Sequence, residues 1–496
     1  MKVPHSEYLA AQRELFRELI RILRREYPYA SVLATDCRGL RYLVQRRETT
    51  IQESRFGERG CVVRIHDGLG YCEHSFNELP ASELPVPGVD GEGSESGGTY
   101  LTAAHALAAE VRRRVGELAE LRDAFPIQAR RYPVAVEEPL RGRWQGEVGE
   151  LPEHAGGEEI VGRLTALRDR AFALTDCLLD MRVLYEGMRV CKLFVSEARE
   201  LEQSYLWSQG YLVPMSRRGE VTRVYHKSSS GLKGTELIEV MERNLPEAVR
   251  VAEELLEARK VEPGEYEVIL NPTVAGLVAH ESFGHGVELD MFVKGRAKAR
   301  EYLGRRVGSA LVSLRDGARS AEEVSSYWFD DEGTPGSDTL VIDRGVFRAG
   351  ISDLLSAFAL GLAPTGNGKR ESFERKAYAR MTNTFFTPGK DRLEDMIASI
   401  RHGYLLEDFI SGMEDPKNWG IQGVVLFGRE IRDGKLTGSI VSPVIITGYV
   451  PEVLQAVSMV SGDFAMSGSG MCGKGHKEYS KTSTGGPYIK TVMRLG

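Results

Sequence analysis

Two histidines and a glutamate stand close together in the segment VAHESFGHGVE, residues 278–288. His280 and His285 can offer neutral imidazole nitrogens to a zinc ion, and Glu281 between them can accept a proton from a water that the metal acidifies. The segment follows the apolar run 272–279, which ends where His280 begins the motif. This pattern predicts a zinc site with a built-in base at the end of a helix.

The spacing of the two histidines differs from that of the pattern His-Glu-x-x-His, in which a separation of four places both rings on one helix face. At about 100° per residue, a regular helix would turn His285 roughly 140° away from His280. We therefore expect the helix to end, bulge or tighten between them, where Gly284 and Gly286 permit a departure at little steric cost. The alternative is two unrelated histidines near a helix end.

A catalytic zinc site has a third protein ligand besides water, and the sequence offers several. Glu288, Asp290 and Glu301 follow the histidines closely, whereas Cys472 and His476 lie far downstream in the glycine-rich segment SGSGMCGKGH. Residue types alone favour Cys472 slightly over Glu301, because a thiol in a mobile glycine-rich loop is better explained by function than by packing. The other candidates stay open at this point.

The elements that must position these residues follow from the hydrophobic periodicity. A β-rich stretch over 31–76 predicts a small antiparallel sheet with a helix against it. Residues 180–230 again have a sequence pattern typical of strands. The strand at 265–272 leads directly into the helix that carries His280, and strand-turn-strand patterns follow it. Apolar residues at helical spacing predict helices over about 5–26, 102–125, 158–176 and 235–260.

These patterns predict an α+β protein with two domains. Residues 1–234 would form an N-terminal α/β domain, with helices packed on an antiparallel sheet, and residues 235–496 a β-rich C-terminal domain that carries the metal site. The segment 77–99 is rich in Pro, Gly, Ser and acidic residues, so we expect a flexible linker there.

The composition of the 496 residues is that of an ordinary globular protein, with 42% hydrophobic and 27% charged residues and a formal net charge of -7. This balance favours neither nucleic acid nor an anionic membrane surface as a partner. No signal-peptide pattern or membrane-spanning run is evident, and the six cysteines show no disulfide framework. We therefore expect a cytoplasmic protein with reduced thiols.

Four motifs in this order resemble the TldD branch of the TldD/PmbA family of metallopeptidases, once called modulators of DNA gyrase. The first domain resembles the family more loosely, and residues 77–99 and 126–157 are not matched in detail. The motifs are HESFGHGVELD (280–290), ARMTNTFF (379–386), TGYVPEVLQAVSMV (447–460) and SGMCGKGHKE (469–478).

The resemblance implies zinc held by His280, His285 and Cys472, with Glu281 as the general base. It also implies an α+β fold and a dimer, formed either with a metal-free PmbA/TldE-like paralogue or with a second copy of the chain. Unfolded peptides would reach a buried zinc through a narrow tunnel. A role for His476 around the metal stays open.

On this interpretation the protein is a zinc-dependent peptidase that hydrolyses unfolded peptides or small protein segments. Two alternatives belong to other classes: a non-catalytic scaffold with a structural zinc, and a zinc hydrolase that acts on small amides. A structural zinc would have four protein ligands, and a closed pocket in place of a strand-wide tunnel would favour a small amide.

Overall fold

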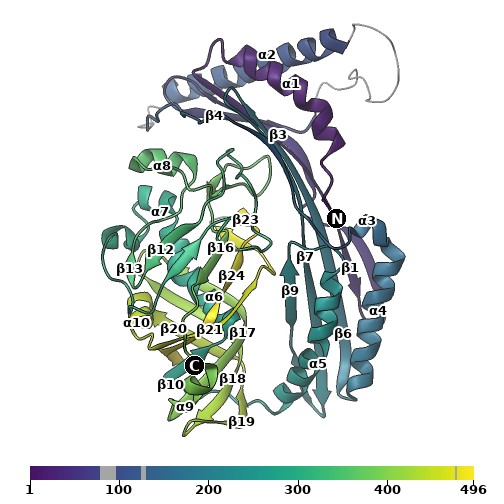
Figure 1. Cartoon of the computed structure of the whole chain (residues 1–496), viewed down its shortest axis with the longest axis vertical. Coiled ribbons are helices and arrows are strands. Elements are labelled where there is room, and N and C mark those ends of the chain that lie inside the picture. Colours follow the sequence, from purple (N-terminus) through teal and green to yellow (C-terminus); the bar gives the residue numbers. More distant parts are fainter. Residues whose placement is uncertain (79–95, 125–129, 475–477) are drawn as a thin grey trace.

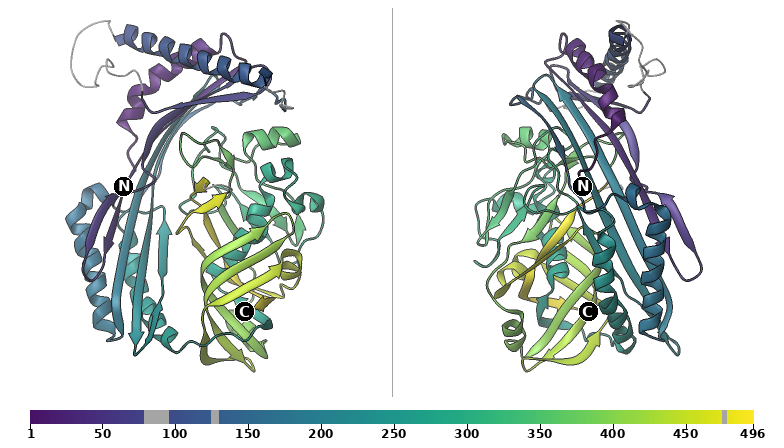
Figure 2. Two further views of the ribbon diagram at one scale, coloured as in Figure 1. Left: turned by 180° about the vertical axis from the view of Figure 1, so that it is seen from behind. Right: turned by 45° about the vertical axis from the view of Figure 1, so that its right-hand side comes forward.

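The computed structural model describes residues 1–78, 96–124, 130–474 and 478–496, and two large sheets dominate them. The first sheet is nine-stranded, long and curved, and it arches over the second sheet (Figures 1 and 2). Its main strand order is β4-β3-β1-β6-β7-β5. Its strands are β1 (Tyr29–Val44), β2 (Thr49–Glu53), β3 (Glu58–His66), β4 (Tyr71–Phe76), β5 (Leu140–Gln145), β6 (Leu178–Ser196), β7 (Arg199–Arg218), β8 (Val221–Val224) and β9 (Lys227–Gly231).

The prediction of a separate small sheet over 31–76 is wrong, because β1 continues through that region and pairs with β6. The antiparallel register runs from Ser31 opposite Ser196 to Val44 opposite Val183. The periodicity of the sequence identifies strands but not the strands with which they pair. The stretch 36–39 interrupts the apolar pattern of the sequence, although strand β1 continues through it. Both strand-rich regions of the first half therefore belong to one sheet.

Helices cover the two ends of the first sheet, as Figure 1 shows. α1 and α2 share an apolar core with β1, β3 and β6, and α4 and α5 pack on β6 and β7. The four long helices predicted from periodicity are confirmed, whereas most of the expected linker, 79–95, lies outside the described residues. These helices are α1 (Glu7–Leu23), α2 (Ser96–Ala124), α4 (Gly157–Leu174) and α5 (Leu237–Glu254), with the short α3 (Pro152–Ala155) and η1 (Leu255–Glu257) beside them.

The second sheet has eleven strands, five of which close on themselves: β10, β17, β18, β20 and β24 pair in turn, and β24 pairs back with β10. The β-rich C-terminal region is thereby confirmed. Its strands are β10 (Gly264–Leu270), β11 (Leu314–Asp316), β12 (Thr339–Asp343), β13 (Val346–Phe347), β16 (Asn383–Phe386), β17 (His402–Asp415), β18 (Gly420–Arg432), β19 (Lys435–Val441), β20 (Val444–Tyr449), β21 (Met459–Ser467) and β24 (Ser483–Leu495).

Smaller elements surround this sheet. Two short hairpins stand apart from it, β14 (Gly368–Lys369) with β15 (Tyr378–Ala379), and β22 (Cys472–Lys474) with β23 (Glu478–Ser480). The short helices are α7 (Leu289–Val293), η4 (Lys298–Tyr302), α8 (Leu354–Leu360), α9 (Leu393–Ala398) and α10 (Val450–Gln455).

Helix α6 (Pro272–Ala279) lies inside the second sheet, in contact with β10, β16, β17, β18, β21 and β24. The side chain of Asn271 accepts a hydrogen bond from the Val274 N–H and caps the helix, and Pro272 occupies its first position. Residues 274–279 are all buried, which is the pattern of a helix that is apolar on every side. The enclosed helix delivers its C-terminal end, and with it His280, to the interior.

Buried ion pairs join the two sheets. Arg64 of β3 lies 2.7 Å from a carboxylate oxygen of Glu332, and Lys192 of β6 pairs with Asp331. Arg370 reaches back to Glu73 of β4 at 3.0 Å. Replacing one partner of such a pair would leave a buried charge without a counter-ion, so the pairs fix which segments of the two layers face each other.

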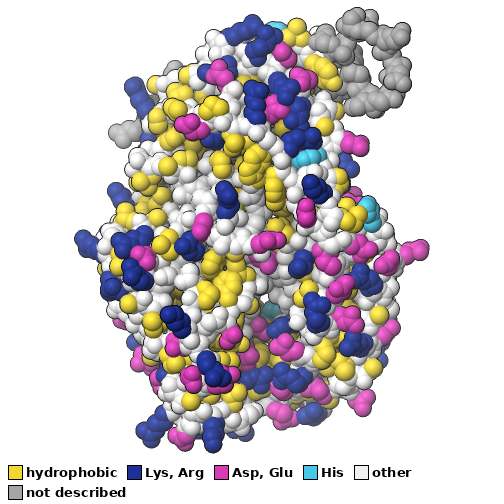
Figure 3. Space-filling model, viewed as in Figure 1, with side chains coloured by type: hydrophobic (Ala, Val, Ile, Leu, Met, Phe, Trp, Pro, Cys, Tyr) yellow, Lys and Arg dark blue, Asp and Glu magenta, His cyan; other side chains and the backbone are white. Residues whose placement is uncertain are grey.

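Helix α5 packs against β7 of the first sheet, and the chain enters the second sheet at Gly264. The domain division between 234 and 235 stays a prediction. On the face in Figure 3, basic and acidic side chains are interspersed. Within the described ranges, no helix combines the length and the apolar character needed to cross a membrane.

The packing of α6 on β24 yields a stability prediction, because the two backbones touch at Gly276. A Cβ built there would lie 2.6 Å from the Gly485 nitrogen, so Gly276→Ala should destabilise the protein by about 2 kcal/mol. Gly162→Ala in α4 is the matched control, since a Cβ there meets nothing within 4 Å and should stabilise by ~0.5 kcal/mol. Thermal denaturation of both variants should give Tm shifts of opposite sign; equal shifts would contradict the close packing.

Candidate metal centre

The helix that carries His280 changes its winding between the two histidines, as the spacing predicts. Residues His280–Gly284 (η2) form a π turn, in which the His285 N–H donates to the His280 carbonyl, and a 3-10 turn (η3, His285–Val287) follows. A π turn closes on the fifth residue, so positions five apart come to the same side. The two imidazole rings lie 4.9 Å apart between centroids, at an angle of 88°.

A glycine is needed at position 284 because Met381 packs closely against it, in addition to the π turn in which it lies. A Cβ built on Gly284 would lie 2.0 Å from the Met381 sulfur, in the segment ARMTNTFF. Gly286 is different, because the nearest atom to its built Cβ is 3.9 Å away. A larger side chain is therefore excluded sterically at Gly284 but not at Gly286.

Cys472 reaches the histidines from the opposite end of the domain. Its sulfur lies 3.1 Å from His285 Nε2, and the ligand atoms of His280, His285 and Cys472 all lie within 4.8 Å of one another. The expected glycine-rich mobile loop is wrong for Cys472 itself, which is buried and belongs to the hairpin β22–β23. Arg380 fixes this hairpin by donating to the carbonyls of Cys472 at 2.8 Å and Glu478 at 2.6 Å.

The two imidazoles control the ionisation of the thiol. Burial raises the pKa of Cys472, but the charges of His285 and His280 and their hydrogen bonds outweigh it and hold that pKa well below its usual range. The thiolate is the form of cysteine that binds metals. The neighbouring imidazoles therefore favour the thiolate form of Cys472.

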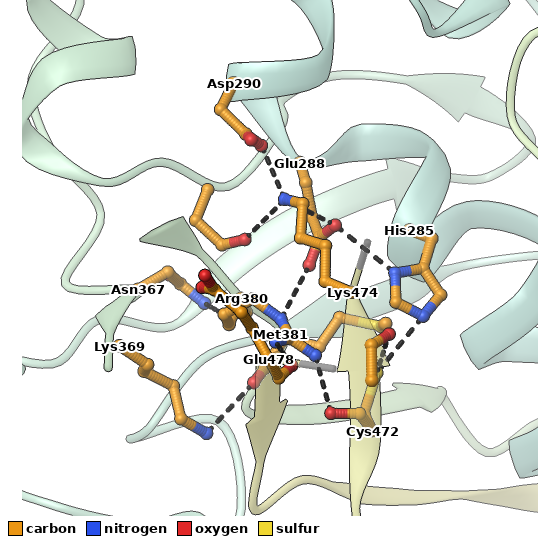
Figure 4. A network of polar contacts seen from close by, with 12 residues as sticks. His285, Glu288, Asp290, Asn367, Lys369, Arg380, Met381, Cys472, Lys474 and Glu478 are labelled. Carbon is orange, nitrogen blue, oxygen red and sulfur yellow. Dashed lines mark hydrogen bonds and ion pairs between the residues drawn. The ribbon is translucent and has the colours of Figure 1, made fainter. Parts of the chain in front are cut away.

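Glu288 holds His285 in place from behind, as the network in Figure 4 shows. One carboxylate oxygen lies 3.3 Å from His285 Nδ1, which leaves Nε2 to face Cys472. Glu288 is itself paired with Lys474 at 2.9 Å and with Arg380 at 3.5 Å. Despite burial, Lys474 and His285 keep the pKa of Glu288 far below its usual range. A carboxylate behind a metal-binding histidine fixes its tautomer and ring orientation.

The remaining ligand candidates take other places. Asp290 lies 2.6 Å from the Lys474 ammonium, and Glu301 is exposed in η4. Neither belongs to the group of three around Cys472, as far as the described residues go. His476 lies outside those residues, so its role stays a prediction.

Glu281 stands beside the trio, and Glu414 of β17 faces it. Ligand atoms of Glu281, His285 and Glu414 lie within 4.8 Å of one another. Burial, followed by smaller effects that include the hydrogen bond with Glu414, raises the pKa of Glu281 to about 7. Gly412 makes room for this carboxylate, because a Cβ there would lie 2.4 Å from Glu281 Oε1.

Sequence reasoning missed Glu414 and Arg380. Glu414 lies in a strand whose sequence alternates polar with other residues, and no motif links it to Glu281, which lies more than a hundred residues earlier. Arg380 stands in ARMTNTFF, which is one of the motifs of the family resemblance, but no role was predicted for any of its residues. Both become visible only when the fold brings β17 and the 380 region to the end of α6.

The residues fit a zinc ion. Two imidazoles and one thiolate form a three-ligand donor set that leaves a position free, as catalytic zinc sites do. His280 Nδ1 and Glu281 Oε2 are buried without a hydrogen-bond partner among the described residues, so the site has polar atoms that the protein alone does not satisfy. A metal with a water would supply such partners.

The second half of the chain is similar in sequence to known proteins. Residues 263–493 match the model of the PmbA/TldA metallopeptidase C-terminal domain. A "Metalloprotease TldD homolog" from Buchnera aphidicola subsp. Acyrthosiphon pisum is 35% identical over 46% of this chain and 47% of that protein. A "Zinc metalloprotease TldD homolog" from Saccharolobus solfataricus is 33% identical over 46% of this chain and 50% of that protein. The chain thus spans about half the length of the curated relatives it matches.

The whole chain has a solved structural counterpart. The crystal structure of TldE from Thermococcus kodakarensis superposes with a TM-score of 0.71 and covers 97% of this chain and 100% of the other, at 18% identity. At that identity the likeness concerns the fold. The α+β architecture predicted from the sequence is confirmed, with both sheets included.

The contact between Glu288 and His285 yields a prediction for metal affinity. Glu288→Gln should weaken zinc binding by roughly 10–100-fold, because the amide orients the imidazole less firmly than the carboxylate. The control is Glu301→Gln, on the exposed η4, which should leave affinity unchanged. Competition with a fluorescent zinc chelator measures both. A loss in the Glu301 variant alone would move the ligand role to Glu301.

Proposed function

We propose that the chain is a member of the TldD/PmbA family of metallopeptidases, whose C-terminal domain model matches residues 263–493, and that it is a zinc-dependent peptidase. His280, His285 and Cys472 would hold the zinc, and Glu281 would be the general base. The observation that carries the proposal is the meeting of two imidazoles and a thiolate beside a buried carboxylate at the end of α6.

Zinc, when bound, supplies a Lewis acid that polarises a peptide carbonyl and acidifies a water. The contribution of the chain is to place that metal and to move a proton. Glu281 takes the proton of the attacking water on its carboxylate and returns it to the departing amine. A pKa near 7 suits a group that must accept and release a proton near neutral pH.

Unfolded peptides are the substrate class we propose. The residues His280, Glu281, His285 and Cys472 are each less than a tenth exposed, and the first sheet arches over this half of the molecule. A folded protein cannot bring its backbone to such a site, whereas an extended chain is narrow enough to reach it. The relatives are named metalloproteases, which supports peptide hydrolysis over hydrolysis of small amides.

We further propose that the protein works in the cytoplasm as a dimer, with a metal-free TldE-like paralogue or with a second copy. The hairpin of β17 and β18 supports an interface, because Ile410 and Met413 on it are 56% and 65% exposed. Exposed large apolar side chains close together are typical of protein contacts.

Replacement of the base is the direct test of the mechanism. Glu281→Gln should keep zinc bound and lower the rate of cleavage of an unstructured peptide by about 100-fold or more, because the amide cannot accept a proton. Metal content and cleavage are measured on the same preparation, with Glu394→Gln on the exposed α9 as the control. Retained activity in the Glu281 variant would contradict its role as base.

The third ligand has a separate test. Cys472→Ser should lower the zinc content measured by elemental analysis, since a hydroxyl is a much poorer zinc ligand than a thiolate. Cys177→Ser is the matched control, because Cys177 lies in the first half of the chain, away from the candidate metal centre. Unchanged zinc in the Cys472 variant would transfer the third position to another residue, with Glu288 the first to examine.

A further inference from the structure

A cavity of ≈ 110 Å³ lies behind the hairpin that carries Cys472, between the first sheet and the C-terminal domain. Trp207 of β7 lines it from the first sheet, and Met471 and Ser480 line it from the hairpin. A volume of this size holds several waters or one small polar group with its hydration. None of its lining residues belongs to the candidate metal centre.

Two lysines line the cavity without an acidic partner. In the described part of the chain, no carboxylate lies within ion-pair distance of the Lys369 or Lys481 ammonium groups. The Lys481 ammonium donates to Gln209 Oε1 at 2.6 Å and to the Gly470 carbonyl at 3.0 Å, and stands 4.5 Å from the centre of the Trp207 ring. Two acceptors leave one of its three N–H donors free.

Lys369 is held in a similar way by neutral groups. Its ammonium donates to Ser325 Oγ at 2.9 Å and to the Met381 carbonyl at 3.2 Å, and it also contacts the Lys481 carbonyl. Burial lowers the pKa of Lys369 and that of Lys481 to about 7. Each ammonium group therefore loses its proton readily near neutral pH, and an anion bound beside the two lysines would favour their charged forms.

Of the four acidic residues that line the cavity, Glu371 is exposed, and the other three are engaged elsewhere. Asp331 pairs with Lys192 and accepts the Arg370 N–H at 2.8 Å. Asp330 accepts backbone N–H groups of the turn that follows it, and Glu58 accepts the Phe373 N–H at 3.0 Å. Among the described residues, the charges of Glu186 and Glu323 act on Lys481 only from beyond ion-pair distance, so an anion in the cavity could contact its free N–H directly.

The hairpin fixes the distance between this end of the cavity and the metal centre. Ser480 pairs with Cys472 across β22 and β23, so Lys481 lies one residue beyond the partner of the candidate zinc ligand. An extended peptide rises about 3.3 Å per residue. A carboxylate within a few residues of a bond at the metal could therefore reach Lys481.

We propose that Lys481 and Lys369 form a carboxylate-binding subsite in this cavity. The ligand would be a carboxylate of a peptide, either its C-terminus or an acidic side chain. Binding of the carboxylate stands on the cavity and its two cations alone. Its assignment to the substrate rests on the proposed peptidase function.

Binding can be measured without turnover through the fluorescence of Trp207, which stands against Lys481. The full chain, with zinc and after treatment with a chelator, is titrated with three probes. N-acetyl-dialanine carries a terminal carboxylate, N-acetyl-dialanine amide carries none, and N-acetyl-aspartic acid 1-amide carries one on its side chain. We expect saturation with a carboxylate probe and none with the amide, whether or not zinc is present.

The variants are Lys481→Met, Lys369→Met and the exposed control Lys435→Met on β19. Lys481→Met should raise the Kd of the carboxylate roughly tenfold or more, because its one free N–H and its charge are lost. Lys369→Met should raise it less, because the three N–H groups of Lys369 already have acceptors and only its charge is lost. The control should not change it. Folding is checked by Tm, which should hold or rise in the cavity variants, since a cation without a counter-ion is removed.

Equal binding of the amide, a requirement for zinc, or an unchanged Kd in both cavity variants would overturn the subsite. The two carboxylate probes separate a C-terminal from a side-chain ligand. If carboxylates bind as expected while no peptide is cleaved, the proposed peptidase function fails and the subsite stands.

Discussion

The hydrogen bond from the His285 N–H to the His280 carbonyl is the constraint on which the metal centre depends. An ordinary i→i+4 bond at this point would rotate His285 away from His280 and from the hairpin of Cys472. The π turn needs room, and Gly284 provides it where Met381 approaches. It also needs an anchored helix before it, which the enclosed α6 supplies through its cap at Asn271 and its backbone contact with β24.

The first sheet contributes to this centre without supplying a ligand. Buried pairs such as Arg64 with Glu332 hold it over the C-terminal domain, and the Gln209 side chain of β7 accepts hydrogen bonds from the Gly470 N–H and from Lys481. The segments on both sides of Cys472 are therefore fixed by a strand of the other layer. The enclosure of the site and the position of its thiol thus depend on the same contact between sheets.

Much of this arrangement could be predicted from the sequence, because it rests on local signals. The apolar run before His280, the five-residue spacing and Gly284 together indicated a break in the helix, and the break is there. The pairing of β1 with β6 and the closed ring of strands could not be predicted, because the sequence of a strand does not identify the strand with which it pairs. The same limit hid Glu414 and Arg380, whose roles exist only through contacts between distant segments.

Two glutamates only seven residues apart, Glu281 and Glu288, have opposite environments at this site. Glu288 is buried between Lys474, Arg380 and His285, so it stays ionised and can only accept hydrogen bonds. Glu281 is buried, no Lys or Arg among the described residues forms an ion pair with it, and Glu414 lies nearby, so its pKa lies at about 7. A permanently charged carboxylate suits the orientation of an imidazole, whereas one poised near neutrality suits proton transfer. The fold thus gives the two residues different chemistry through their neighbours, since their side chains are identical.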